Sequence, residues 1–393
     1  MELKALQKHI LTLATLQESN APVVSCYLNL TADEYLNVLD ERVRVLRRSL
    51  SGEPLHYFED ALRLIDTFLA TGVQAGTKGV AVFARGGQQP FFLPLQFRVS
   101  LPNWIAAAST PNIYHLIELK DTYHRYVVML ATAKSVRILA INLGSVTQDL
   151  WTQRPELRQR VGREWTKEHY QSHRRERTNQ FINEQIAILD RLMSAGGYGH
   201  LVLAGNPRVT SEIRKALPKH LAAKVVDVVP ASEYDPTSDV VAATLASFIE
   251  KEERESVAVV DKLQKEINTH GLAVADTRAS FEALRQGQVD VLVLAKAYEP
   301  DAAWICGACG ATEVEQPAPD ACPQCRARKM RQFNVKEEMV RVAEQMGSEV
   351  EVVNHSDTLM RLGGVGCLLR FLGSEKYHNG GRIKGKGSAG KRA

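Results

Sequence analysis

The chain has 393 residues, of which 45% are hydrophobic and 24% are charged, and its formal net charge is +4. This length predicts two or three domains, and the composition is that of a globular protein. No apolar run approaches the ~18 residues that a membrane span needs. The first 17 residues carry Leu3, Leu6, Ile10 and Leu13 at helical spacing, which predicts an amphipathic helix rather than a signal peptide. We therefore expect a cytoplasmic protein without a membrane partner.

Residues 1–121 are expected to form an N-terminal α/β domain. The expected strands lie at 23–30, 79–84 and 91–97, and the expected helices at 39–50 and 62–69. The last two strands flank Gly86-Gly87-Gln88, a pattern typical of a β-hairpin turn. Pro94 has no amide proton to give to a sheet, so we expect its strand at an edge. Cys26 alternates with apolar residues, which favours a place in the core.

A middle domain is expected over residues 122–233. Strand patterns at 125–144, 199–205 and 225–229 alternate with helical patterns through Ile182–Met193 and through Ile213. This alternation is typical of a parallel or mixed sheet with helices on its faces.

Residues 238–375 are expected to form a C-terminal domain. Asp276 is placed to cap a helix that Gly287 ends, and Gly347 is placed to end another helix. The tail, residues 376–393, is rich in glycine and basic residues, so we expect it to lie outside the packed fold.

A basic segment, residues 154–177, lies within the middle domain. Cations suit phosphates and aromatic rings suit stacking on bases, so this segment is a candidate RNA-binding loop and helix. The candidates are Arg158, Arg160, Arg163, Trp165, Lys167, His169, Arg174, Arg175 and Arg177. A solvated helix face with a few ion pairs is the alternative. In the tail, Lys384 and Lys386 are expected either to meet RNA phosphates or to keep the tail soluble.

The tail segment GGRIKGKGS resembles a phosphate-binding loop but has Gly387 where serine or threonine should hold Mg²⁺. No strand precedes it and no helix follows, so we expect no bound nucleotide.

Four cysteines form the pattern CxxC-x12-CxxC. They are Cys306, Cys309, Cys322 and Cys325. Two such pairs present four thiolates to one tetrahedral ion, which predicts a zinc ribbon over residues 304–328. Four protein ligands leave no position for a reactive water, so the predicted zinc is structural. A redox CxxC pair or unligated cysteines are the alternatives.

Several segments resemble the archaeal and eukaryotic class-one release factors and Pelota. In the C-terminal domain they are GLAVADTRASFEALRQGQVDVLVL (271–294), EEMVRVAEQMGSEVEVVNHSD (337–357) and GGVGCLLRF (363–371). In the middle domain they are RYVVMLATAKSVRILAINLG (125–144) and YGHLVLAG (198–205). The resemblance covers residues 122–373. It implies a three-domain, release-factor-like α/β architecture with the zinc ribbon inserted in the C-terminal domain.

The resemblance places the family's catalytic Gly-Gly-Gln loop at residues 161–171, but this segment reads VGREWTKEHYQ. After Trp165 and Thr166 comes Lys167, whose ammonium cannot accept a hydrogen bond from an attacking water. Gln171 is more typical of a helix position. The tripeptide at residues 86–88 lies at least 70 residues earlier, in the expected hairpin. We therefore expect no catalytic residues.

The N-terminal domain has no stop-codon-reading loop of the Asn-Ile-Lys-Ser kind. The chain most resembles the bacterial branch that contains the hibernation factor Balon. This implies a factor that occupies the ribosomal A site against 16S and 23S rRNA, with elongation factor Tu or a related GTPase as partner. A ribosome-rescue peptidyl-tRNA hydrolase is one alternative, and a zinc-ribbon protein that acts away from the ribosome is another.

Overall fold

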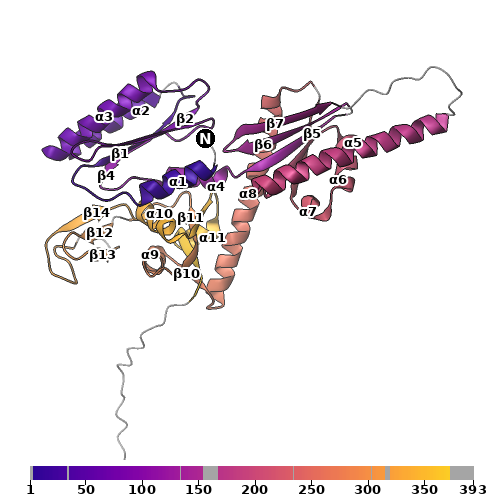
Figure 1. Ribbon diagram of the computed structural model, residues 1–393. Helices are drawn as coiled ribbons and strands as arrows, with labels where there is room; N and C mark the ends of the chain where they lie inside the picture. The colour runs from indigo at the N-terminus through magenta and orange to yellow at the C-terminus, as the bar shows by residue number, and fades with distance from the viewer. Residues whose placement is uncertain are drawn as a thin grey trace, which may run out of the picture.

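The computed structural model describes residues 3–32, 35–132, 134–153, 167–232, 234–301, 303–314 and 319–371. Figure 1 shows α/β domains that meet at the centre of the molecule, and a long helix that extends away from them. The expected α/β class is therefore confirmed. Within the described ranges, no helix has the length and apolar character needed to cross a membrane.

The N-terminal domain is an antiparallel sheet in the order β3-β2-β1-β4. Its elements are α1 (Leu3–Ala14), β1 (Val23–Asn29), α2 (Tyr35–Ser49), α3 (Glu53–Thr71), β2 (Gly79–Arg85), β3 (Phe91–Phe97) and β4 (Trp104–Ala108). Helices α2 and α3 cover one face, where Cys26 packs in the core as expected. The strand that contains Pro94 lies at the edge, also as expected. Tyr27 and Phe83 point from the other face toward α1.

The middle domain is a mixed sheet in the order β7-β6-β5-β8-β9, in which β5, β8 and β9 are parallel. Helix α4 (Tyr114–Thr122) precedes this domain and packs outside its core. The elements of the domain are β5 (Tyr126–Ala131), β6 (Ser135–Asn142), β7 (Ser145–Gln153), α5 (Lys167–Gly196), β8 (His200–Gly205), α6 (Pro207–Ala216), α7 (Lys219–Ala222) and β9 (Val225–Pro230). Helices α5, α6 and α7 cover one face of this sheet. The predicted hairpin gains a third strand, β7, which pairs with β6 and ends at Gln153, directly before the predicted basic segment.

The C-terminal domain has the sheet order β10-β16-β11-β15, with a small separate sheet, β13-β12-β14, inserted after β11. Its elements are α8 (Thr237–Asn268), β10 (Ala273–Ala275), α9 (Thr277–Arg285), β11 (Val289–Ala295), β12 (Ala303–Cys306), β13 (Thr312–Glu313), β14 (Met330–Phe333), α10 (Val335–Met346), β15 (Glu349–Val353), α11 (Asp357–Arg361) and β16 (Val365–Leu369). As predicted, the carboxylate of Asp276 caps α9 by accepting from the Ala279 amide at 2.9 Å. Gly347 ends α10 with φ +65°.

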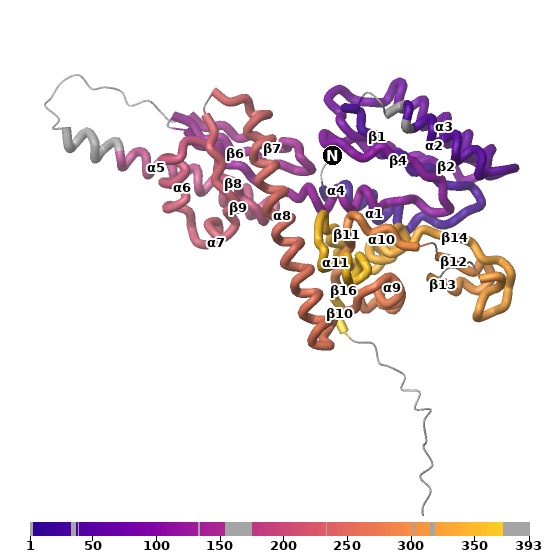
Figure 2. The backbone as a smooth tube through the Cα atoms, turned by 180° about the vertical axis from the view of Figure 1, so that it is seen from behind, coloured from indigo at the N-terminus to yellow at the C-terminus, as the bar shows by residue number. Residues whose placement is uncertain are grey.

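Helix α8 packs against two sheets, that of the middle domain and that of the C-terminal domain. It has 32 residues and so is about 48 Å long. Its first half buries Val240 and Phe248 against the middle sheet, where the Phe248 ring stacks on Tyr126 at 4.6 Å between centroids. Its second half buries Val260 and Leu263 in the C-terminal core. Figure 2 shows the helix passing from one domain to the other, so it fixes their relative positions.

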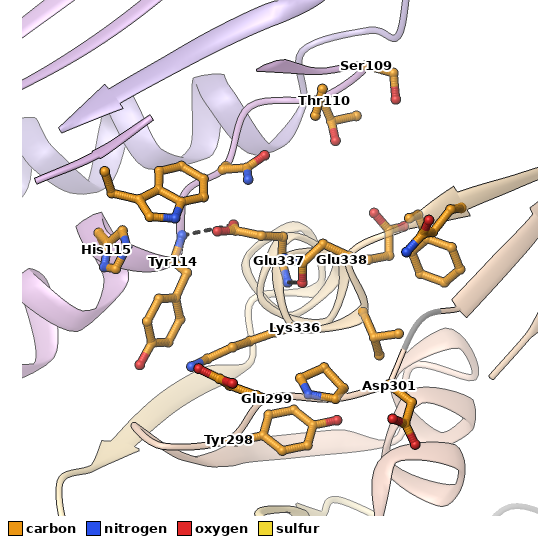
Figure 3. Close-up of a pocket in the computed structure, with 18 of the residues that line it drawn as sticks. Ser109, Thr110, Tyr114, His115, Tyr298, Glu299, Asp301, Lys336, Glu337 and Glu338 are labelled. Atoms are coloured by element: carbon orange, nitrogen blue, oxygen red, sulfur yellow. Dashed lines mark hydrogen bonds between the residues drawn. The ribbon is translucent and has the colours of Figure 1, made fainter. Parts of the chain in front are cut away.

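Helix α4 joins the N-terminal domain to the C-terminal domain. No side chain of its own segment caps its first turn. Instead, the carboxylate of Glu337, from α10, accepts hydrogen bonds from the backbone amides of Ile113 and Tyr114 at 2.8 and 3.0 Å (Figure 3). The ammonium of Lys336 lies 3.8 Å from the centre of the Tyr114 ring, a cation–π contact. A carboxylate is favourable at a helix N-terminus, so these contacts hold the two domains together.

Further polar contacts support this junction at the C-terminal end of α4. Lys120 forms an ion pair with Glu344 at 2.5 Å, and the Asp121 carboxylate accepts from the Val352 amide at 2.9 Å. The apolar core is also continuous across the junction, because side chains of α1, α4 and α10 belong to one cluster.

Burial raises the pKa of Glu337 to about 7, although the two backbone donors oppose the shift. In the unfolded chain the pKa of a glutamate is about 4.3. At pH values between these two pKa values, Glu337 is protonated in the folded protein and ionised in the unfolded chain. The contribution of Glu337 to stability is therefore complete at low pH and is lost as the pH rises through about 7.

We predict that Glu337→Gln removes this pH dependence. The amide oxygen of glutamine still accepts from both backbone amides but carries no charge. Near pH 5 the variant and the wild type should unfold at similar temperatures, whereas near pH 8 the variant should be more stable by about 3 kcal/mol. Thermal unfolding at both pH values measures this, with Glu299→Gln, on the exposed rim, as control. A difference that is the same at both pH values would contradict the assignment.

Candidate nucleic-acid interface and metal centre

The predicted RNA-binding helix is α5, and its base is anchored in the middle domain. Five apolar side chains on one face are buried against the sheet: Phe181, Ile182, Ile186, Leu189 and Met193. Residues 175–180, which precede Phe181, are exposed or half-buried, and none of them belongs to this cluster. Burial of the apolar stripe therefore holds the base of the helix, whereas residues 175–180 lie outside the apolar core.

Of the predicted RNA-binding residues, Arg175 and Arg177 have described side chains, and both are exposed. Lys167, His169 and Arg174 lie in the first turns of α5, and their side chains are outside the described part. Arg158, Arg160, Arg163, Trp165, Lys384 and Lys386 lie outside the described residues. Gln171 is part of α5, as its sequence position predicts.

An exposed aromatic residue near this segment is absent from the predicted set. Trp151 lies on the edge strand β7 and is 63% exposed, opposite Arg137 in the neighbouring strand. The guanidinium of Arg137 is held by Asp149, with Nε 2.8 Å from the carboxylate. The segment SVTQDLWTQ has no regular alternation of polar and apolar residues, so its sequence gives no clear signal for an exposed strand.

The tripeptide Gly86-Gly87-Gln88 is a turn between β2 and β3, as predicted. A Cβ on Gly86 would lie 2.4 Å from the carbonyl oxygen of Tyr57, and Gly87 has φ +83°. Both glycines are therefore required by the close approach to α3 and by the backbone conformation. Gln88 is exposed, and it lies in a different domain from the basic segment.

The four cysteines come together at the tip of the small sheet. The sulfur atoms of Cys306 and Cys325 are 3.6 Å apart, those of Cys309 and Cys322 are 3.5 Å apart, and all four lie within 4.8 Å of one another. Ligands of a tetrahedral zinc with bonds of about 2.3 Å would be about 3.8 Å apart. The set therefore fits a metal ion such as zinc.

Backbone amides favour thiolates at this cluster. The amides of Ala308 and Cys309 lower the pKa of the Cys306 thiol to about 6. The amides of Cys325 and Gln324 lower the pKa of the Cys322 thiol. Because a thiolate is the form that binds metal, the loops are suited to one ion.

A cleft of about 860 Å³ lies between the N-terminal and C-terminal domains, beside the Glu337 contact (Figure 3). Its charged lining consists of Glu118, Lys296, Glu299, Asp301, Arg331, Lys336, Glu337 and Glu338. Two of these groups, Lys296 and Glu118, form an ion pair at 2.7 Å. This mixture of charges favours no one class of ligand.

The middle part of the chain is similar to known translation release factors. Residues 111–248 match the model of Bacterial archaeo-eukaryotic release factor family 10. This match begins just before α4 and ends at Phe248, the α8 residue that stacks on Tyr126. A stretch of 137 residues is also 28% identical to peptide chain release factor subunit 1 of Pyrococcus abyssi. The middle part of the chain is thus similar to archaeo-eukaryotic release factors.

The alignment with the Pyrococcus protein covers 30% of this chain and 33% of that relative. Two solved structures align with most of this chain at low sequence identity. Ribosome-bound archaeal Pelota, from a complex with ABCE1, has a TM-score of 0.40 at 14% identity, with 94% of each chain covered. Saccharomyces cerevisiae Dom34, which interacts with Hbs1, has a TM-score of 0.39 at 10% identity, with 76% of this chain and 81% of that chain covered.

We predict that Cys306→Ser loses one bound metal ion per chain and lowers the temperature at which the C-terminal domain unfolds. The reason is that metal binding to such a site contributes directly to folding free energy. Elemental analysis and calorimetry measure the two effects. Cys367→Ala is the control, because Cys367 is buried in the same domain but belongs to β16. Retention of both metal and unfolding temperature in Cys306→Ser would contradict the metal centre.

Proposed function

We propose that this protein is a ribosome-binding translation factor of the hibernation type, which occupies the A site and keeps the ribosome inactive. The observation that carries the proposal is the sequence of its middle domain. Residues 111–248 match a release-factor family, yet the segment 161–171, where the family's catalytic loop is expected, contains no Gly-Gly-Gln. The chain therefore retains the ribosome-directed domain without the tripeptide that assists hydrolysis.

In this proposal α5 carries the basic segment to ribosomal RNA near the peptidyl transferase centre. The exposed Arg175 and Arg177 support this role, because they lie beyond the anchored part of the helix. Their guanidinium groups would contact phosphates of 23S rRNA. Neutralising phosphates releases counterions, so binding should weaken steeply as salt is added.

The other two domains would occupy the remaining parts of the site. We propose that the N-terminal domain lies in the decoding region against 16S rRNA without reading a codon. The C-terminal domain would face elongation factor Tu or a related GTPase. The interaction of the similar yeast protein Dom34 with Hbs1 supports a partner-binding role. We further propose that the four cysteines hold a structural Zn²⁺ ion that keeps the small sheet folded.

A rescue factor that hydrolyses peptidyl-tRNA is the alternative. It would need a group that positions a water molecule against the ester. Lys167 stands at the start of α5, and its ammonium can donate hydrogen bonds but cannot accept one. Gln171 lies within the helix, where the backbone lacks the freedom that a pair of glycines gives. These features favour occupation of the site over hydrolysis.

We predict that replacing both Arg175 and Arg177 by glutamine weakens binding to vacant ribosomes. The slope of log affinity against log salt concentration should fall by roughly 1 to 2, since each lost phosphate contact removes about one counterion. Co-sedimentation over a range of salt concentrations measures both quantities.

The matched control is Arg191→Gln, an exposed arginine about 21 Å further along the same helix. This variant should bind as the wild type does. Equal binding by all three proteins, or wild-type binding that is indifferent to salt, would contradict the phosphate contacts.

A further inference from the structure

We propose that His200, Glu252 and Glu255 form a binding site for a divalent transition-metal ion, such as Zn²⁺, where the middle domain meets α8. The proposal is independent of the function proposed above and concerns a different place from the four cysteines. These three residues form a potential ligand cluster in the described part of the chain, with ligand atoms within 4.8 Å of one another. One imidazole and two carboxylates are ligands that zinc and manganese accept.

The backbone brings the three ligands to one point. His200 is the first residue of β8, and Glu252 and Glu255 lie three residues apart on α8, hence on one face of the helix. The ring of His200 packs edge-on against Phe248, one turn earlier on α8, with 5.4 Å between centroids. The imidazole is therefore positioned beside the carboxylates by a buried aromatic contact.

Each carboxylate has one oxygen engaged elsewhere and the other directed at His200. Oε2 of Glu252 bonds to Nδ1 of His124 at 2.9 Å, and Oε1 of Glu255 pairs with Lys251. The remaining oxygens, Oε1 of Glu252 and Oε2 of Glu255, each lie 3.9 Å from Nε2 of His200. His124 would then act as the hydrogen-bonding partner that orients a ligating carboxylate.

The distance of 3.9 Å is too long for a hydrogen bond but close to the separation of two ligands on one ion. With bonds of about 2.1 Å, neighbouring ligand atoms lie roughly 3 to 3.4 Å apart, so small side-chain rotations close the site. Moreover, Oε1 of Glu252 is buried and has no hydrogen-bond partner. A buried polar atom without a partner is costly, and a bound cation would satisfy it.

The electrostatics of the surroundings also favour a cation. Asp121 and Glu351 face the same junction, and burial, together with the charge of neighbouring carboxylates, raises the pKa of Asp121 to about 8 and also raises that of Glu351. Glu252 contributes to this repulsion in both cases. An ion at the cluster would relieve the repulsion. It would also fasten β8 to α8 where the helix leaves the middle sheet.

The test uses the full chain, stripped of metal with a chelator and reloaded with Zn²⁺ alone. Zinc per chain, measured by elemental analysis after gel filtration, should fall by one equivalent in His200→Ala and by one in Glu252→Ala. The matched control is His220→Ala, because His220 also faces a carboxylate, that of Asp190, at 3.0 Å. This control should bind as much zinc as the wild type.

Reloading with Co²⁺ shows that the variants are folded. Thiolates on cobalt give a charge-transfer absorption that imidazole and carboxylates do not, so both variants should retain the absorption of the cysteine cluster. Equal zinc content in the wild type, His200→Ala and Glu252→Ala would overturn the proposal. A wild-type chain that holds only the zinc lost in Cys306→Ser would overturn it as well.

Discussion

The arrangement of the domains depends on one helix that must bury side chains in two cores. The first half of α8 packs on the middle sheet, and its second half packs on the C-terminal sheet. Because a continuous helix bends little over about 48 Å, the two sheets are held at a set separation. Rotation of one domain against the other would expose either Phe248 or Leu263 to water.

The N-terminal domain is added to this frame by a different kind of contact. Its sheet and α1 share an apolar core with α10, while Glu337 supplies the missing cap of α4. The buried carboxylate is costly when ionised, whereas the apolar contacts are insensitive to pH. The C-terminal domain is thus connected to the other two domains in different ways. The continuous helix α8 connects it to the middle domain, whereas side-chain packing and the titratable Glu337 connect it to the N-terminal domain.

This frame explains how the basic helix is presented. The buried stripe from Phe181 to Met193 fixes the direction of α5 against the middle sheet, which α8 in turn holds against the C-terminal domain. Arg175 and Arg177 are therefore exposed on a helix whose buried stripe is fixed against the middle sheet. In the proposed function, α5 and the C-terminal domain make contacts at different parts of the ribosomal site. A rigid connection between them would allow both contacts to form at the same time.

Much of the local structure could be predicted from the sequence where a single physical rule dominates. Pro94 predicted an edge strand because it lacks an amide proton, and Asp276 predicted a helix cap. The strand β4, WIAAA, was missed because it is short and three of its five residues are alanine, which is depleted in strands. The strand β7 was missed because its polar residues resemble a loop.

Long-range features could not be predicted, because no local pattern encodes them. A glutamate in the first turn of a helix, such as Glu337, ordinarily faces solvent, and only the fold shows that it caps α4. The double role of α8 follows from which sheets flank it. His200 and Glu252 are 52 positions apart, and their meeting depends on the packing of β8 against α8. The four cysteines were predictable because their ligand spacing is local within each pair.

The central claim is that this chain occupies the A site and leaves the peptidyl-tRNA intact. Cryo-electron microscopy of ribosomes that carry a peptidyl-tRNA in the P site, mixed with the full chain, tests this most directly. The account predicts a map with the chain in the A site, the N-terminal turns of α5 against 23S rRNA and an unbroken ester on the P-site tRNA. An empty A site, or a bound chain beside deacylated tRNA, would contradict it.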